Sequence, residues 1–268
     1  MGFVCTFTDH SVYVYECGSS VIIVPLYVDD LLIGFKDEEH MLRIKKALEE
    51  RFKMTDAGPA SWVLGMQIWI DMLQGMVSID QSQYIRKVLQ RYGMADCKPV
   101  ATLLPKKVML RAASDEEAEA AWNYLYLQVI GSVMYAMLGT RPDIAYAVST
   151  LSHYSSRPGI QHVNALKHLL RYLKGSMEYR IVYSCNGGGL MGCESEVKSN
   201  EIQNNIIGYT DSNYAMDLDT HCSVSGAVFL LTGGPISWSS KLQNTISQSS
   251  TEAEYIASTE ATKEAVWL

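Results

Sequence analysis

The sequence predicts a mixed α/β (α+β) protein built from two parts. Over residues 1–183, short apolar runs typical of strands alternate with amphipathic segments of helical period. Between residues 184 and 205 the composition shifts to Asn, Gly, Ser and Glu, which is typical of a linker. Three strand patterns and one helical pattern follow over residues 206–268. We therefore expect a larger mixed part, a linker and a smaller β-β-β-α part.

The composition is that of a globular protein large enough for one large core or two modest ones. Of the 268 residues, 48% are hydrophobic and 19% charged, which excludes wholesale disorder. No apolar run approaches the length of a membrane span and no secretory signal opens the chain, so no membrane partner is expected. Six scattered cysteines without a CxxC pair favour a reducing compartment over a disulfide framework or a zinc site.

Alternating and continuous apolar runs predict the strands. Pro25 lies inside one of these runs and indicates an edge position or a bulge, because proline cannot donate a ladder hydrogen bond. Residues 71–75 separate two runs and predict a hairpin loop. The expected strands are 11–16, 21–28, 31–35, 62–70, 76–79, 206–210, 225–231 and 235–239.

Apolar residues at helical spacing predict the helices. Ser114 and Glu117 form a capping-box pattern that opens a long helical stretch, which we expect to break near Gly131 and to stop at Thr140-Arg141-Pro142. Gly93 ends the helix before it. The expected helices are 37–54, 82–92, the stretch from 114 to the stop at 140, 143–154, 161–173 and a last one from about 250 onward.

Charge is unevenly distributed. The net charge of −7 argues by itself against a nucleic-acid binder. Residues 84–111, however, hold seven cations and one anion, and residues 153–180 hold five cations and one anion. Two such stretches can bind a polyanion locally, or they are solvated helix faces, and charge alone does not decide between the two. The candidate nucleic-acid-binding residues are Arg86, Lys87, Lys106, Lys107, Lys167, Arg171 and Lys174.

Two adjacent carboxylates, Asp29 and Asp30, stand between two apolar, strand-like runs. Carboxylates held rigidly at the tip of a hairpin are suited to Mg²⁺, which takes oxygen ligands and supports phosphoryl transfer in two-metal sites. Aspartate is also common in purely structural turns, and the dipeptide alone favours that interpretation. The apolar flanks, which we expect to be buried, shift the balance toward a metal site.

Several motifs in order resemble one family. The stretch VPLYVDDLLIG around Tyr27-Val28-Asp29-Asp30 resembles the active-site hairpin of reverse transcriptases, specifically those of copia-type LTR retrotransposon Pol polyproteins. Further resemblances lie at 62–68 (WVLGMQI), 131–135 (GSVMY), 140–148 (TRPDIAYAV) and 168–175 (HLLRYLKG). The stretches GYTDS, GPISW and SSTEAEY, at 208–212, 234–238 and 249–255, are similar to the family's RNase H domain.

The resemblance implies the fold: a partial reverse-transcriptase palm with a helical thumb and connection region, then a truncated RNase H-like β-β-β-α unit. It also implies the site residues. Asp29 and Asp30 would hold Mg²⁺ for polymerisation, and Asp211 and Glu254 would hold Mg²⁺ for RNase H cleavage. The resemblance favours Glu254 over Glu252, because Glu254-Tyr255-Ile256-Ala257 is similar to the family's Glu-apolar-apolar-Ala step. The two glutamates point about 200° apart on a helix and cannot share one site, and Glu252 is interpreted as helix N-terminal charge.

Contacts with the primer terminus are implied as well. Tyr27 of the YVDD stretch would lie beside the primer terminus, and Gly65 and Met66 belong to a hairpin that would grip it. The implied partners are an RNA template, a DNA primer, an RNA–DNA hybrid and the remainder of the Pol polyprotein. The implied location is intracellular: cytoplasmic, in a virus-like particle, and in part nuclear.

The family's metal sites need more carboxylates than these motifs contain, so each cage is expected to be partial. The expected function is that of a fragment of an RNA-directed DNA polymerase and RNase H that is inactive alone and acts within the full polyprotein. The alternative is a truncated or domesticated retroelement relic that binds nucleic acid or is inert. The five tryptophans are expected in the core rather than as base-stacking platforms, and the histidines at 153, 162 and 168 at the surface or in packing.

Overall fold

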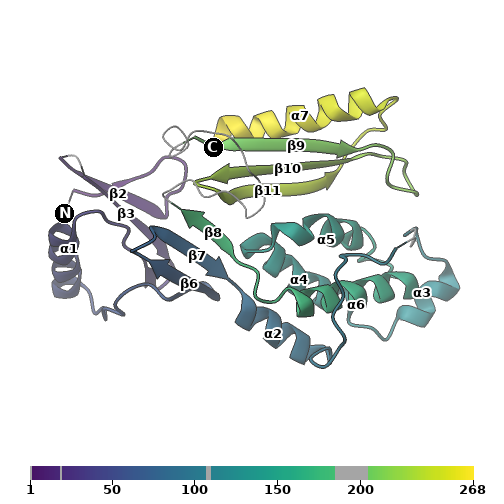
Figure 1. Cartoon of the computed structure of the whole chain (residues 1–268), viewed down its shortest axis with the longest axis horizontal. Coiled ribbons are helices and arrows are strands. Elements are labelled where there is room, and N and C mark those ends of the chain that lie inside the picture. Colours follow the sequence, from purple (N-terminus) through teal and green to yellow (C-terminus); the bar gives the residue numbers. More distant parts are fainter. Residues whose placement is uncertain (1, 19, 107–109, 185–204) are drawn as a thin grey trace. The chain divides into compact units, whose positions relative to one another are not determined.

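The computed structural model describes residues 2–18, 20–106, 110–184 and 205–268. It contains three antiparallel sheets and seven α-helices in these ranges, which confirms the predicted α+β class (Figure 1). The chain divides into two compact units, Met1–Val63 and Leu64–Leu268. None of the helices in the described residues is both long and apolar enough to cross a membrane.

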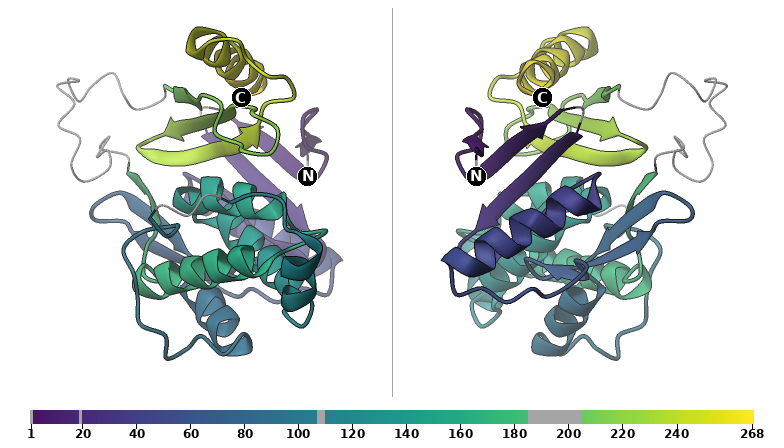
Figure 2. Two further views of the ribbon diagram at one scale, coloured as in Figure 1. Left: turned by 90° about the vertical axis from the view of Figure 1, so that its right-hand side faces the viewer. Right: turned by 90° about the vertical axis from the view of Figure 1, so that its left-hand side faces the viewer.

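The first unit is a sheet of four strands with one helix packed on a face. The strands are β1 (Val4–Cys5), β2 (Val12–Cys17), β3 (Ser20–Tyr27) and β4 (Asp30–Leu31), hydrogen-bonded in that order. Helix α1 (Glu38–Arg51) begins at Asp37, whose side chain accepts a hydrogen bond from the backbone N–H of Glu39. Ile44 of α1 packs against the buried Ile22 and Val24 of β3, and Figure 2 shows α1 lying across the strands. A two-residue strand, β5 (Trp62–Val63), ends the unit.

Two expectations for this sheet are wrong. The strand expected at 31–35 is paired with β3 only at Asp30–Leu31, with one further bridge at Gly34. The strand expected at 21–28, which is β3, is not buried throughout, because its side chains alternate between the two faces of the sheet. Ile22 and Val24 face α1, while Val21 and Ile23 are nearly half exposed. The apolar run at 21–28 therefore belongs to a sheet that is covered on one face only.

Pro25 lies in a central strand, not at an edge, because β3 pairs with both β2 and β4. The structure tolerates it because β4 ends at Leu31, one residue before the position opposite Pro25. The Pro25 carbonyl still accepts a hydrogen bond from the Leu32 N–H at 3.2 Å. Ile23 and Gly34 exchange both backbone hydrogen bonds, and the next such pair along β3 is Pro25 and Leu32. The missing proline N–H therefore costs the reciprocal bond to the Leu32 carbonyl, at a position where β4 has already ended.

The second unit begins with a small sheet. Strands β6 (Met66–Asp71) and β7 (Met76–Asp80) form the predicted hairpin. Strand β8 (Ile181–Ser184), which the sequence did not predict, adds to β7 from about a hundred residues further along the chain. Four residues after a long helix carry too little periodicity to be recognised as a strand.

A helical core follows this hairpin. It consists of α2 (Ser82–Arg91), α3 (Asp115–Ala121), α4 (Tyr126–Gly139), a 3₁₀ turn (Pro142–Ile144), α5 (Ala145–Ser152) and α6 (Ile160–Gly175). Ser114 forms the predicted capping box with Glu117. The predicted break at Gly131 is wrong, because α4 runs through this glycine and the break lies at residues 122–125. Tyr126 starts α4 fully buried, with its O–H donating to the Leu151 carbonyl at 2.8 Å.

The predicted stop after α4 is confirmed and has a buried anchor. Arg141 is 1% exposed and pairs with Asp143, with nitrogen–oxygen distances of 2.9 and 2.7 Å. Its guanidinium also donates to the Ser176 carbonyl and hydroxyl. The pair therefore ties the start of the 3₁₀ turn to the C-terminal end of α6.

The third sheet and the last helix form the predicted β-β-β-α unit. Strands β9 (Ile207–Asn213), β10 (Val224–Leu231) and β11 (Gly234–Leu242) pair antiparallel in the order β11-β10-β9. Helix α7 (Ser250–Trp267) packs on β9 and β10, as Figure 1 shows. Its buried residues Ala253, Ala257 and Ala261 recur every four positions, which allows a close approach to the strands.

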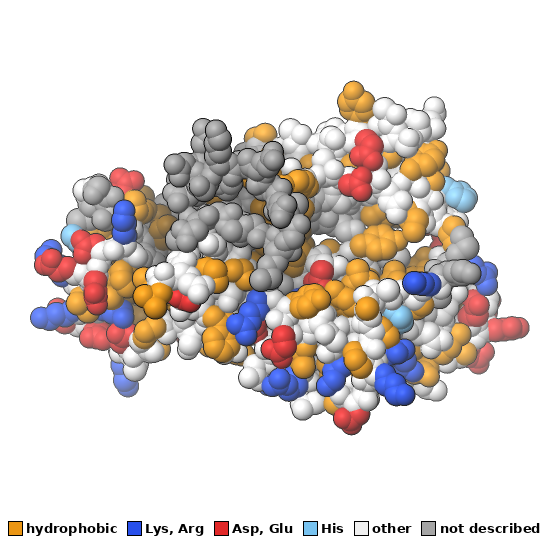
Figure 3. Space-filling model, viewed as in Figure 1, with side chains coloured by type: hydrophobic (Ala, Val, Ile, Leu, Met, Phe, Trp, Pro, Cys, Tyr) orange, Lys and Arg blue, Asp and Glu red, His pale blue; other side chains and the backbone are white. Residues whose placement is uncertain are grey.

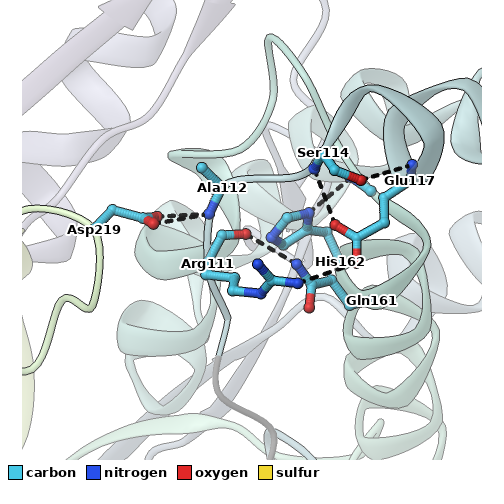
Figure 4. A network of polar contacts seen from close by, with 8 residues as sticks. Arg111, Ala112, Ser114, Glu117, Gln161, His162 and Asp219 are labelled. Atoms are coloured by element: carbon cyan, nitrogen blue, oxygen red, sulfur yellow. Dashed lines mark hydrogen bonds and ion pairs between the residues drawn. The ribbon is translucent and has the colours of Figure 1, made fainter.

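This β-β-β-α unit is joined to the helical core by hydrogen bonds. The Asp219 carboxylate, in the loop after β9, accepts hydrogen bonds from the Ala112 N–H at 2.8 and 3.0 Å and from the Tyr154 hydroxyl at 3.3 Å. Figure 4 shows the Asp219 carboxylate beside Ala112, in the extended segment that leads into the capping box at Ser114. The Trp238 indole N–H donates to the Met137 carbonyl of α4 at 3.1 Å.

Candidate functional site

The Asp pair lies at a tight turn. Tyr27 pairs directly with Asp30, so Val28 and Asp29 alone form the turn between β3 and β4. Both aspartates and Tyr27 are exposed at this end of the sheet. The tight turn expected at the Asp pair is therefore confirmed, although Asp30 already belongs to β4 and only Asp29 is a turn residue.

The turn has an unusual backbone at Val28. Its φ is +53°, in the left-handed region that a β-branched residue rarely adopts. A positive φ at the first central residue of a two-residue hairpin turn is usually met by glycine. The strain of such a residue is about 1–3 kcal/mol, and it is characteristic of functional sites. Val28 is 81% exposed, so burial of its side chain does not offset this cost.

The aspartates have the right donor type for Mg²⁺, because carboxylate oxygens are the ligands that this ion prefers. They provide two carboxylates at one turn. In the described ranges no group of three or more His, Cys, Asp or Glu residues lies close enough to hold a metal ion. The donor set at the turn thus fits part of a Mg²⁺ cage, and the remaining ligands would come from water, substrate or other protein residues.

Gly65 and Met66 lie at a second turn, at the start of the other unit. Leu64 and Gly65 have φ values of +48° and +73°, and Met66 begins β6. Two consecutive positive φ values are the pattern of a type I′ turn, in which glycine at the second position is favoured. The backbone conformation of this turn explains the glycine without any reference to a ligand.

Asp211 and Glu254 converge although they are 43 positions apart in the sequence. Asp211 lies in β9, opposite Gly226 of β10, and Glu254 lies in the second turn of α7. The Glu254 carboxylate accepts a hydrogen bond at 3.3 Å from the N–H of Ser212, the residue next to Asp211. Both carboxylates are exposed. Asp211 lies within β9 rather than at its end, because the strand continues to Asn213.

Glu252 has a different role. Its carboxylate accepts a hydrogen bond from the Gln248 N–H at 2.7 Å, and its own N–H donates to the Ser249 side chain at 3.2 Å. These two bonds close the N-terminal turn of α7. This supports the choice of Glu254 as the candidate ligand.

The candidate cations of the earlier basic stretch lie mainly on α2. Arg86 and Lys87 are exposed on this helix, and Lys106 is exposed in the segment that follows. Lys107 lies outside the described residues. Figure 3 shows Lys and Arg side chains gathered over the helices of the second unit.

The cations of α6 are partly engaged within the protein. Lys167 is exposed and its ammonium lies 4.5 Å from the centre of the Tyr124 ring. Arg171 is half buried and its guanidinium donates to the Lys98 carbonyl at 2.7 Å, which holds the segment around Lys98 against α6. Lys174 is half buried. The structure therefore brings Lys98 beside Arg171, a proximity that sequence reasoning did not find.

The expectation that the tryptophans belong to the core is wrong for four of the five. Trp122, Trp267, Trp62 and Trp69 are 85%, 66%, 49% and 44% exposed. Among the histidines, His162 is fully buried and its Nδ1 accepts a hydrogen bond from the Gly159 N–H, so it has the packing role expected of it.

Comparison with known proteins gives consistent similarities. Residues 1–106 match the family described as reverse transcriptase (RNA-dependent DNA polymerase). The chain is 40% identical over 98% of its length to the retrovirus-related Pol polyprotein from transposon TNT 1-94 of Nicotiana tabacum, and 33% identical over its whole length to that from transposon RE2 of Arabidopsis thaliana. It spans about a fifth of these polyproteins: 19% of the first and 17% of the second.

A shorter relative matches along almost its whole length. An uncharacterised mitochondrial protein of Arabidopsis thaliana is 31% identical over 90% of this chain and 92% of its own length. No solved structure matches the chain at a significant level.

Proposed function

Because the chain belongs to the Pol polyprotein family of copia-type retrotransposons and carries its reverse-transcriptase-like region, we propose that Asp29 and Asp30 take part in RNA-directed DNA synthesis. The observation that carries this proposal is the turn at Val28–Asp29. It presents two exposed carboxylates on a backbone strained at Val28, within the residues that match the reverse-transcriptase family.

Mg²⁺ would be held by the two carboxylates together with ligands from elsewhere in the polyprotein. When bound, the metal ions stabilise the charge that develops on the attacking and leaving oxygens during phosphoryl transfer. The turn's contribution is to place the two carboxylates next to each other at the end of the β3–β4 hairpin. Tyr27, exposed one residue before the turn, is a proposed contact of the primer terminus. Gly65 and Met66 of the second turn are proposed separately as residues that contact it.

For the β-β-β-α unit we propose an RNase H-like role. The support is that β9 and α7 bring Glu254 within hydrogen-bond distance of the residue beside Asp211, with both carboxylates exposed. These residues fit part of a Mg²⁺ site by donor type. The substrate would be the RNA strand of an RNA–DNA hybrid, recognised through phosphates and 2′-hydroxyls.

The proposed partners are those of the polymerase reaction. They are an RNA template, a DNA primer, an RNA–DNA hybrid and the remainder of the polyprotein, in the cytoplasm within a virus-like particle and in part in the nucleus. The exposed cations Arg86, Lys87, Lys106 and Lys167 would neutralise backbone phosphates.

A second candidate is a non-catalytic protein that keeps the fold and the basic surface. It is favoured by one observation: the mitochondrial relative is matched over 92% of its own length by this chain. A chain of this extent thus occurs as a separate protein. Under this alternative the basic surface binds nucleic acid, or the protein is inert. Substitutions at Asp29 or Asp30 then leave nucleic-acid binding unchanged.

The test is to replace the matching segment of the tobacco polyprotein with this chain and to measure RNA-templated primer extension. We expect extension with the wild-type segment. Asp29→Asn and Asp30→Asn should each reduce the rate by more than about a hundredfold, since even residues that only support metal ligands can cost that much. Asp96→Asn, an exposed aspartate in a loop, is the control. Equal rates for all three variants would contradict the proposal and favour the second candidate.

A further inference from the structure

We infer that Tyr135 is a positioning residue for the primer terminus: its hydroxyl fixes the turn at Leu64–Gly65 by donating to the Leu64 carbonyl oxygen at 2.5 Å. Tyr135 lies on α4, 71 positions away in the sequence. The inference rests on the proposed function, because it is there that Gly65 and Met66 contact the primer. It gives a role to the stretch 131–135, which the proposed function leaves without one.

The turn needs such support. Leu64 holds a φ of +48°, a conformation that side chains other than glycine adopt at a cost. The Leu64 side chain is 37% exposed, so its packing gives limited stabilisation. A hydrogen bond to the carbonyl of this same residue directly stabilises the strained peptide unit and orients the N–H groups that follow.

A second contact links Tyr135 to the turn. A Cβ atom added at Gly65 would lie 3.2 Å from the Tyr135 hydroxyl oxygen, and among the described residues beyond its chain neighbours no other atom would lie within 4 Å. The hydroxyl therefore lies against both residues of the turn. Glycine at position 65 provides the left-handed conformation and the space for the hydroxyl.

Tyr135 is itself held in place by α2. Its ring meets the Tyr84 ring edge-on, with centroids 4.8 Å apart. The Tyr84 hydroxyl donates to the Ser132 carbonyl at 2.9 Å, and the Tyr92 hydroxyl lies 3.0 Å from the Ser132 Oγ. Ser132 and Tyr135 are three residues apart on α4 and share one face of the helix. A chain of contacts therefore runs from α2 through α4 to the turn.

The consequence is a coupling between the helical core and the primer-contacting turn. A displacement of α4 would be transmitted to Leu64 through a single hydroxyl group. Loss of the hydroxyl should loosen the turn while the aromatic packing and the buried face of α4 stay intact.

The first test measures the turn alone. In Tyr135→Phe, hydrogen exchange of the backbone amides over residues 62–68 should become about fivefold faster, the factor that corresponds to one hydrogen bond of ordinary net strength. Tyr126→Phe is the matched control: it removes a hydroxyl-to-carbonyl hydrogen bond made by the same helix, to Leu151 at 2.8 Å, but none at the turn, so exchange over 62–68 should stay as in the wild type. Unchanged exchange in Tyr135→Phe would overturn the inference.

The second test measures the primer. A primer–template carrying 2-aminopurine as the last primer nucleotide is bound to the full chain, and its fluorescence is compared with that of a primer labelled ten nucleotides inward. We expect Tyr135→Phe to change the signal of the terminal label and not that of the internal label, at unchanged affinity. If both proteins bind the primer–template and the terminal label gives the same signal with Tyr135→Phe as with the wild type, the positioning role is overturned. The hydroxyl is then only a structural contact. No binding by the wild type would instead contradict the proposed function, while the exchange result still reports on the contact.

Discussion

At the scale of single residues, the most informative feature is the left-handed conformation of Val28. This turn places the neighbouring carboxylates. The conformational strain lies in the backbone of Val28, whose side chain is 81% exposed and gains little from packing. Stability alone would favour glycine here. A valine in a strained position therefore points to a function of the turn rather than to a contribution of Val28 to folding.

Substitution of this residue tests the strain. Val28→Gly should raise the free energy of unfolding by about 1 kcal/mol, because the strain relieved exceeds the added entropy of the unfolded glycine chain. Val21→Gly, at a half-exposed position of β3, the strand that leads into the turn, should lower the free energy of unfolding by about 1 kcal/mol. Urea unfolding followed by circular dichroism measures both. A loss of stability in Val28→Gly would show that the turn is not strained.

Asp80 gives a second residue-scale prediction, in pH dependence. Its burial raises the pKa of the carboxyl, but hydrogen bonds from the Ser82 hydroxyl and N–H and from the Trp69 indole, together with the charge of Arg180, outweigh burial and leave the pKa below its ordinary value. A lowered folded-state pKa stabilises the fold above the unfolded-state pKa of about 3.9, and this stabilisation disappears as the pH falls through the folded-state pKa.

Asp80→Asn should therefore cost about 2 kcal/mol of stability at pH 7. The difference from wild type should be constant above about pH 5 and should shrink below about pH 4. Unfolding by urea at a series of pH values measures this. Asp96→Asn is the exposed control. A difference that does not change with pH would show that ionised Asp80 is not the stabilising species.

At the same scale, sequence reasoning found side chains whose partners are near in sequence or set by a motif. Glu254 was distinguished from Glu252 by its resemblance to the family's motif, and the hydrogen bond of Glu252 to Gln248 agrees with that choice. Tyr135 could not be found, because a hydroxyl-to-carbonyl contact with Leu64 leaves no periodic or compositional signal.

At the scale of elements, helix propensity and packing give opposite predictions for Gly131. Glycine lowers helix stability, so a break was expected there, yet α4 continues because Val129, Ile130 and Val133 are buried on either side. Tertiary packing of these residues therefore offsets the loss of helix stability that the exposed glycine causes. The actual break, at residues 122–125, has no glycine or proline to mark it.

The two glycines of α4 offer a matched pair. Gly131→Ala should raise the free energy of unfolding by about 1 kcal/mol, because the new Cβ meets nothing within 4 Å and alanine is the better helix former. Gly139→Ala should lower it by about 1–3 kcal/mol, because its Cβ would lie 2.6 Å from the Gln81 side-chain oxygen. Thermal unfolding compares the two. A gain in stability for both would mean that the packing around Gln81 is loose.

At the scale of the whole molecule, the distribution of charge predicts how the binding of nucleic acid should depend on salt. A chain of net charge −7 repels a polyanion overall, so the proposed nucleic-acid binding would depend on the local cations of the helical core. Affinity for an RNA–DNA hybrid should fall steeply with salt concentration. Arg86→Ala and Lys167→Ala should each reduce the slope of log affinity against log salt by about 1. Lys263→Ala, on α7 and paired with Glu260, should leave the slope unchanged. Fluorescence anisotropy measures this, and a flat salt dependence would favour an inert relic.

The fold class and most elements could be predicted because periodicity is local. The division into compact units at Val63 and Leu64 could not, because it depends on which contacts form between distant segments. The same holds for β8, which pairs with β7 across about a hundred residues. The motif at Tyr27–Asp30 was predictable as a turn, but its strain is a backbone property that the residue types do not reveal.

The central claim is that the carboxylates at Asp29–Asp30 are placed to bind a divalent metal ion. The most direct measurement is a titration of the isotope-labelled chain with Mn²⁺, a paramagnetic substitute for Mg²⁺, followed by NMR. We predict selective broadening of the amide signals of residues 27–31 at low Mn²⁺, lost in Asp29→Asn with Asp30→Asn. Broadening of these signals no greater than that around other exposed carboxylates, such as Asp96, would contradict the claim.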